Sequence, residues 1–594
     1  MTHATALFNA ASLDQRMSLH YQVAMPLPQN HYFHVTLKVE AWQATHLELI
    51  MPVWTPGSYL VREYARHVQE FTATNGVGQP LPWRKLSKNQ WRIDCPDTPT
   101  ITVHYRVFAN ELTVRTNHLD RTHGYFNGAA LFCYLPGYQQ NPLTVEIIPP
   151  FPDWQITTAL PAKGEGLFWA ADFDTLVDSP FEIGPNQIYD FEAEGKPHQW
   201  VIWGDGNFDI TQLIEDTQKI IATEAALFGG LPYEQYQFIL HLTANNFGGL
   251  EHKNCCSLIY SRFALGVGAS LAEQYREKYY RFLQLVAHEF FHLWNVKRIR
   301  PIELETFDYT QENYTPSLWF CEGITSYYDL LIPHWAGIYG VDTYLESLSR
   351  DITRYLLTPG RKVQPLSESS FDAWIKLYRR DAHSDNSQMS YYLKGQLVAL
   401  LLDLKIRQRH DNGRSLNTVM VQMWEQFGRE ERGYSAAELV AVLESVAGCD
   451  LSDFLARYLH GLDELPLQTY LQPFGLKLQA IAAQTPDLGL RTKEENGRTV
   501  ITFVVADSPA AQVGIDPGDE LVAIAGWRVN TEQLESRLQD FQPGDEVAIA
   551  FFHDDYLCHA TVTLREPQPH QYKLMRIKSP TPEQKALLAG WLRW

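Results

Sequence analysis

The stretch LVAHEFFHLWN contains two histidines and a glutamate at the spacing of a metal site. Its apolar residues recur with a helical period, so His288 and His292, four residues apart, share one helix face. Two imidazoles on one face can bind the same cation, and Glu289 beside them can act as a general base for water. The pattern predicts a hydrolytic zinc centre, although two helix histidines satisfied by hydrogen bonds would give the same letters.

A catalytic zinc commonly has three protein ligands and one open position, so a further ligand is expected downstream. Glu322 is the candidate, because the segment SLWFCEGITSYYDLL surrounds it with large apolar side chains. A carboxylate on a buried helix needs a partner, and a zinc ion would supply one. A surface glutamate on that helix is the alternative interpretation.

The elements around these residues change character along the chain. Short stretches with alternating polarity, such as TITVHYRVF, predict an all-β N-terminal domain, and long helical periods such as MSYYLKGQLVALLLDLKIRQRH follow. A Pro-containing stretch, DELPLQTYLQPFG, marks a boundary before a compact module with turn-rich SPAAQVGIDPGDE. The predicted parts are a β domain (1–192), a mostly helical domain (193–465) that contains the predicted zinc centre, a C-terminal module (466–566) and a tail (567–594).

Several separated motifs resemble known peptidases. HEFFHLW and WFCEG are similar to the aminopeptidase N family of gluzincin metallopeptidases. The continuation WNVKRIRP resembles instead the glycyl aminopeptidase family, metallopeptidase family sixty-one. The chain is similar to that family in four further places: the segments MPVWTPGSYLVREYARHV, GGLEH and SYYLKG, and a C-terminal PDZ module. The resemblance implies a multidomain α+β protein with an N-terminal all-β domain, a thermolysin-like mostly helical catalytic domain and a C-terminal PDZ domain.

The resemblance also implies two further groups in the site. Tyr-x-Lys-Gly in YYLKG is similar to the aminopeptidase N tyrosine motif, which implies Tyr392 as the donor to the oxyanion. Tyr391 and Tyr392 point about 100° apart on a helix, so one of them can face the metal, and the spacing to Lys394 and Gly395 favours Tyr392. Two core aromatic residues are the alternative.

The segment GGLEH is similar to the Gly-x-Met-Glu-Asn loop of aminopeptidase N relatives. By that resemblance Gly248 and Gly249 let the backbone approach the substrate, and Glu251 binds the free α-amine. Leu250 and His252 depart from the aminopeptidase N pattern and fit the glycyl aminopeptidase pattern. An ordinary surface turn is the alternative interpretation.

These motifs predict an aminopeptidase with one zinc per chain. It would use zinc-activated water to remove glycine and alanine from peptides with a free N-terminus, and the small-residue preference comes from the resemblance. A zinc endopeptidase is the runner-up, and an inactive peptide-binding PDZ scaffold is a further alternative. Leu488-Gly489-Leu490 lies where a PDZ carboxylate-binding loop would be, which makes the C-terminus of a peptide a possible ligand.

Composition restricts the partners and the compartment. A formal net charge of −20 disfavours nucleic acid and anionic membrane surfaces. Seven scattered cysteines do not resemble a disulfide framework, the N-terminus lacks the features of a signal peptide, and no apolar run is as long as a membrane span. We therefore expect a cytoplasmic protein.

Overall fold

The computed structural model describes residues 17–266 and 273–593 of the chain. The expectation about a signal peptide concerns residues outside this range, as do the first residues of the expected helix before His288. The chain divides into two compact units. The first comprises Met1–Phe208, Tyr233–Gly266 and Phe307–Glu312, and the second comprises Asp209–Pro232, Val267–Thr306 and Asn313–Trp594.

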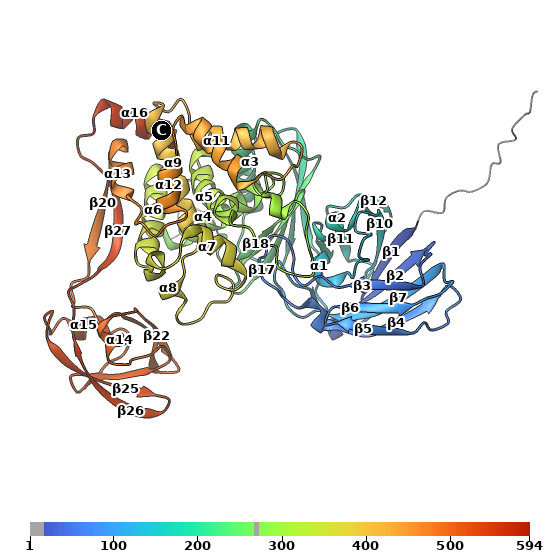
Figure 1. Cartoon of the computed structure of the whole chain (residues 1–594), viewed down its shortest axis with the longest axis horizontal. Helices are drawn as coiled ribbons and strands as arrows, with labels where there is room; N and C mark the ends of the chain where they lie inside the picture. The colour runs from blue at the N-terminus through green and yellow to red at the C-terminus, as the bar shows by residue number, and fades with distance from the viewer. Residues whose placement is uncertain (1–16, 267–272, 594) are drawn as a thin grey trace, which may run out of the picture. The chain divides into compact units, whose positions relative to one another are not determined.

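The first unit begins with a seven-stranded sheet, drawn in blue and teal in Figure 1. In β2 every second side chain is buried, from Phe33 to Val39, which is the pattern of a strand with one face in the core. The strands, in sheet order, are β12 (Ala162–Gly164), β13 (Leu167–Ala170), β10 (Leu143–Ile148), β1 (Ser18–Ala24), β2 (Tyr32–Glu40), β7 (Thr100–Phe108) and β4 (Val68–Asn75).

Two smaller sheets complete this β region. They share the buried core of the larger sheet, to which Leu47, Trp91, Phe126 and Ile183 contribute. One contains β3 (His46–Ile50), β6 (Gln90–Asp94) and β5 (Trp83–Ser87); the other contains β11 (Gln155–Thr157), β14 (Phe181–Gly184), β9 (Gly124–Phe126) and β8 (His118–Leu119). The expected N-terminal all-β region is confirmed.

A five-stranded sheet in the first unit carries the GGLEH segment. Its order is β15 (Gln187–Ala193), β16 (Lys196–Trp203), β17 (Tyr236–Thr243), β19 (Cys255–Ser261) and β18 (Gly248–Glu251). The three central strands are parallel, and nearly all residues of β17 and β19 are buried, as expected for strands covered on both faces. Strand β18 runs antiparallel at one edge, so Gly248–Glu251 lies on an edge strand.

The second unit is mostly helical. Helix α9 is buried on nearly every face, which explains its long apolar run, and it packs against α5 and the segment Trp319–Gly323. The longer helices before the C-terminal module are α3 (Ile210–Phe228), α4 (Glu273–Phe291), α5 (Ile324–Trp335), α6 (Val341–Leu356), α9 (Tyr391–Arg409), α10 (Leu416–Met423), α11 (Ala436–Ala447) and α12 (Ser452–Tyr458).

The C-terminal module has its own apolar core, which includes Ile501, Leu521, Ile549 and Val562. Its sheet contains β21 (Leu490–Glu495), β22 (Arg498–Val504), β23 (Glu520–Ile524), β25 (Glu546–His553) and β26 (Tyr556–Thr563), and β24 (Trp527–Arg528) pairs with β23. The expected helical middle region and PDZ-like β region are confirmed.

The residues expected to form a tail contain ordered elements. Strand β27 (Pro569–Arg576) pairs antiparallel with β20 (Leu476–Ala482), so the chain enters and leaves the PDZ module along neighbouring strands. Helix α16 (Pro582–Leu592) follows, and its buried Trp591 donates a hydrogen bond from Nε1 to the Tyr327 hydroxyl at 3.0 Å.

No helix among the described residues is long and apolar enough to cross a membrane. The seven cysteines are free thiols, and Cys95, Cys133, Cys255, Cys256 and Cys321 are buried. Buried thiols of this kind pack as small apolar side chains.

Candidate metal centre

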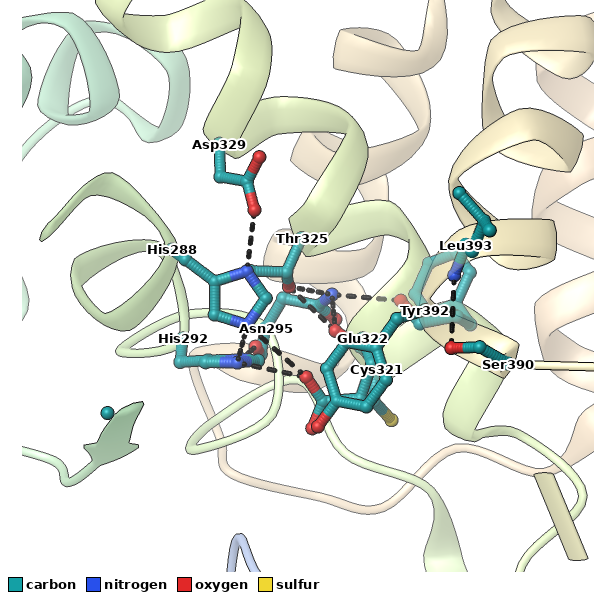
Figure 2. Close-up of polar contacts among 12 residues, drawn as sticks. His288, His292, Asn295, Cys321, Glu322, Thr325, Asp329, Ser390, Tyr392 and Leu393 are labelled. Carbon is teal, nitrogen blue, oxygen red and sulfur yellow. Dashed lines mark hydrogen bonds and ion pairs between the residues drawn. The ribbon is translucent and has the colours of Figure 1, made fainter. Parts of the chain in front are cut away.

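The second unit brings His288, His292 and Glu322 together. The His288 and His292 Nε2 atoms lie 3.0 Å apart, and the Glu322 Oε2 atom lies 3.4 Å from the first and 3.2 Å from the second (Figure 2). His288 lies in the last turn of α4, and His292 follows the end of that helix at Phe291. Two imidazole nitrogens and one carboxylate oxygen therefore converge from two helical segments.

Glu322 reaches this point from a π-helix, Trp319–Gly323, that continues directly into α5. A π-helical turn is wider than an α-helical turn, and such bulges often occur at functional sites. Only 1% of Glu322 is exposed. Burial alone would raise the pKa of its carboxyl group, but attraction to His292 and hydrogen bonds from both histidines lower it to about 2. The side chain is thus an anionic acceptor.

Each histidine is oriented through its other ring nitrogen. His288 Nδ1 lies 2.8 Å from Asp329 Oδ2, and His292 Nδ1 lies 2.6 Å from the Asn295 carbonyl oxygen (Figure 2). The Asn295 amide donates to the carbonyl oxygens of Phe320 and Cys321, which ties the histidines to the π-helix. Partners of this type fix the tautomer that turns Nε2 toward a metal.

Sequence reasoning did not identify Asp329 or Asn295, although the signal for Asp329 is present. Asp329 follows Glu322 by seven residues, which is about two helical turns, so both carboxylates face the same side of one helix. Asn295 has a weaker signal as a polar residue directly after HLW in an otherwise apolar stretch.

The two proposed catalytic side chains lie in the same unit. Glu289 follows His288 on α4 and is 4% exposed. The ring of Tyr392 stacks against that of His288 at an interplanar angle of 27°, with centroids 6.2 Å apart, whereas Tyr391 is fully buried. Burial, together with the Glu322 carboxylate, raises the pKa of the Tyr392 hydroxyl well above 10, so it remains a hydrogen-bond donor at neutral pH.

Tyr378, which sequence reasoning also missed, lies beside Tyr392. Their hydroxyl oxygens are 3.1 Å apart, and Tyr378 precedes helix α9 in a stretch without a recognisable motif. This contact can hold the Tyr392 hydroxyl in one orientation.

A glycine contact fixes the two motif helices relative to one another. A Cβ atom added at Gly323 would lie 2.5 Å from the Gly395 Cα, and one added at Gly395 would lie 2.9 Å from the Gly323 Cα. The glycines of WFCEG and YYLKG therefore allow backbone to touch backbone where α9 crosses the π-helix. This crossing sets the positions of Glu322, which precedes Gly323 directly, and of Tyr392, which lies three residues before Gly395.

The segment Gly248–Glu251 belongs to the first unit. Strand β18 is held by Arg115, whose Nη2 donates to the Gly249 carbonyl oxygen at 2.9 Å. His252, directly after it, contacts Asp178 Oδ1 through Nδ1 at 3.2 Å. Glu251 is 4% exposed, and its Oε1 atom has no hydrogen-bond partner among the described residues. A buried carboxylate in this state is suited to a cationic ligand.

The arrangement of His288, His292 and Glu322 fits a metal ion. Two histidine nitrogens and one carboxylate oxygen lie within 3.4 Å of one another, and a two-histidine, one-glutamate set is a known ligand set of catalytic zinc.

A second cluster, formed by His123, Glu182 and His241 in the first unit, differs from this arrangement. There His123 Nδ1 and His241 Nε2 each lie 2.9 Å from a different oxygen of the Glu182 carboxylate. That pattern is a buried hydrogen-bond network, because each histidine nitrogen lies at hydrogen-bond distance from its own carboxylate oxygen.

Comparison with known proteins shows which families the chain resembles. Family models match for the peptidase M61 N-terminal domain over residues 20–185, the M61 glycyl aminopeptidase over residues 281–398 and the PDZ domain over residues 486–564. No curated protein matches the chain.

Solved structures also resemble this chain. The crystal structure of an aminopeptidase N family protein from Idiomarina loihiensis is 33% identical, covers 97% of this chain and 100% of that chain, and superposes with a TM-score of 0.91. An M1 zinc metallopeptidase from Deinococcus radiodurans is 15% identical and covers 76% of this chain and 96% of that chain, with a TM-score of 0.46.

Proposed function

This chain belongs to the M61 glycyl aminopeptidase family and is a metallo-aminopeptidase, and from that premise we propose that it uses zinc to remove small N-terminal residues, glycine and alanine, from peptides. The convergence of His288 Nε2, His292 Nε2 and Glu322 Oε2 supports the metal site. The small-residue preference rests on the family. Peptides with a free N-terminus are the proposed substrates, and the PDZ module is proposed to bind peptide C-termini.

The residues of the chain have distinct roles in this proposal. His288, His292 and Glu322 hold one zinc ion, which when bound lowers the pKa of water and polarises the substrate carbonyl group. Glu289 accepts the proton of the attacking water and passes a proton to the leaving amine. The Tyr392 hydroxyl donates a hydrogen bond to the oxyanion that forms on the substrate carbonyl.

In this proposal Glu251 makes the enzyme an aminopeptidase. Its buried carboxylate pairs with the α-ammonium group of the substrate, which fixes the N-terminus and selects the first peptide bond. A blocked terminus would leave the carboxylate buried without a cation, which is unfavourable. An endopeptidase would have no use for such an anchor.

The test is the cleavage of glycyl and alanyl amides with free and with acetylated termini. We expect the natural enzyme to cleave only the free-amine substrates and a chelator to abolish cleavage. Glu251→Gln should lower kcat/KM on free-amine substrates by about 10–100-fold, since a hydrogen bond to a charged group contributes about 1.5–3 kcal/mol. It should also discriminate less between free and acetylated termini.

Glu192→Gln is the matched control, because Glu192 is an exposed carboxylate on β15, at the opposite edge of the same sheet. It should behave as the natural enzyme. If the natural enzyme cuts acetylated and internal bonds as readily as free termini, the endopeptidase interpretation is correct.

Tyr392→Phe tests the oxyanion donor, and the neighbouring Tyr391→Phe is its control. Removal of one such donor typically lowers kcat by about 10²–10³-fold, while the zinc content should stay unchanged. Tyr391 is fully buried, so its variant should retain most of the turnover. A larger loss of kcat in Tyr391→Phe than in Tyr392→Phe would assign the role to Tyr391.

A further inference from the structure

The turn Thr55–Ser58, in the N-terminal β region of the first unit, packs against Glu251. The Ser58 amide donates to the Thr55 carbonyl oxygen at 3.1 Å, with Pro56 and Gly57 between them. Gly57 has a φ of +84°, so Pro-Gly at the centre of the turn is typical of a type II turn. Thr55 and Ser58 are almost fully buried, which is unusual for a tight turn.

The tip of this turn meets the Glu251 side chain. A Cβ atom at residue 57 would lie 2.5 Å from Glu251 Oε1, 2.7 Å from Oε2 and 2.7 Å from Leu250 Cδ1. These separations are well below the roughly 3.5–4.0 Å of favourable non-bonded contact. The turn therefore favours glycine at residue 57, and any Cβ atom there would have to displace the Glu251 carboxylate and the Leu250 side chain.

Hydrogen bonds hold both sides of this contact in place. The Thr55 hydroxyl donates to Asn127 Oδ1 at 3.1 Å, and Arg62 Nη2 donates to the Ser58 hydroxyl at 3.0 Å. On the other side, Arg115 holds Gly249, and the Arg115 carbonyl oxygen accepts from the Tyr64 hydroxyl at 2.8 Å. The turn and strand β18 are thus supported by the same β region.

We propose that the Thr55–Ser58 turn forms one wall of the subsite for the substrate α-ammonium group and that Gly57 is the positioning residue for Glu251. This inference rests on the proposed role of Glu251. The backbone at Gly57 limits the positions open to the carboxylate, and the Oε1 atom, which has no hydrogen bond to any described residue, is left for the ammonium group. An added methyl group would move the carboxylate and weaken binding of the amine, without touching the metal ligands.

Gly57→Ala tests the proposal, with Gly137→Ala as a matched control. Gly137 has a φ of +82°, nearly the same as Gly57, but a Cβ atom there would meet no atom within 4 Å. Both variants strain the backbone to a similar degree, and only the first contacts Glu251. Relative to Gly137→Ala, Gly57→Ala should raise KM and lower kcat/KM on glycyl amides at least tenfold, with unchanged zinc content. Equal kinetics of the two variants would overturn the proposal.

A double-variant comparison separates a positioning role from a general structural one. In a Glu251→Gln background the anchor is already lost, so adding Gly57→Ala should change kcat/KM by less than threefold. If Gly57→Ala lowers kcat/KM by the same factor in the Glu251→Gln background as in the natural enzyme, the turn does not act through Glu251, and the proposal is overturned. If Gly57→Ala does not fold, the double variant Gly57→Ala with Glu251→Asp should fold, because the shorter aspartate makes room for the added methyl group. Failure of that double variant to fold, with Gly137→Ala folded, would also overturn it.

The natural enzyme distinguishes this inference from the proposed function. If it fails to discriminate free from acetylated termini, Glu251 is not the amine anchor, and both proposals fall. If it discriminates and Gly57→Ala matches Gly137→Ala, the inference about the turn alone is wrong. Binding of glycinamide and of N-acetylglycinamide, measured by calorimetry, gives the same comparison without turnover.

Discussion

Glu289→Gln should lower kcat by about 10³–10⁴-fold while the protein keeps its zinc, because general base catalysis contributes up to this amount and an amide cannot accept the proton of water. Glutamine has nearly the same shape as glutamate, so the packing around residue 289, which is 4% exposed, should be retained. The measurement is single-turnover cleavage of a glycyl amide, together with the metal content of the same preparation.

The control for this variant is Glu277→Gln on the same helix. Glu277 is exposed and pairs with Arg350 at 3.2 Å, an interaction that contributes little to stability. The Glu277→Gln variant should have the kcat and the zinc content of the natural enzyme. A Glu289→Gln enzyme that turns over at the natural rate would exclude Glu289 as the base, and one that loses its zinc would give Glu289 a role in metal binding.

Glu322→Ala should empty the metal site and abolish activity, because it removes one of the three proposed ligands and leaves the Nε2 atoms of His288 and His292 without the Glu322 carboxylate. The β region and the PDZ module have separate cores and should remain folded. Metal analysis after dialysis, with circular dichroism on the same samples, measures both results.

The chain offers a close control in Glu425→Ala. Glu425 lies in another π-helix, Trp424–Gly428, where it is exposed and pairs with Arg429. The Glu425→Ala variant should keep its zinc.

The zinc affinity of Asp329→Asn should lie between those of Glu322→Ala and Glu425→Ala. It should be weakened by about 10–100-fold, since partners of metal-bound histidines typically contribute this much. Stoichiometric zinc in Glu322→Ala would remove that residue from the ligand set.

The parts of the site that the sequence predicts are those defined by local spacing. His288 and His292 need only one helix to share a face, and Glu322 is identified by its apolar neighbours in the chain. Asp329 was open to the same reasoning, since it follows Glu322 by about two turns. The all-β, helical and PDZ-like regions likewise follow from hydrophobic periods that each segment carries by itself.

Contacts between residues far apart in the chain were beyond this reasoning. Nothing in YYLKG or WFCEG indicates that their glycines touch, because the contact arises from the crossing of two helices. The same holds for Gly57 and Glu251, whose contact depends on the packing of a turn against an edge strand. The strand β27 and the helix α16 after residue 567 were not predicted, because the residues that they contact lie elsewhere in the sequence. Strand β27 pairs with β20, and Trp591 of α16 donates a hydrogen bond to Tyr327.

The contact between Gly323 and Gly395 also limits how this enzyme can evolve. Every single-nucleotide change that replaces a glycine codon with a codon for another amino acid adds a Cβ atom, and at either position that atom would lie less than 3 Å from backbone atoms of the other segment. Neighbouring side chains cannot relieve such an overlap by changing rotamer, since the obstruction is main chain. Substitution at either glycine is therefore possible only together with a shift of one of the two helical segments that carry Glu322 and Tyr392.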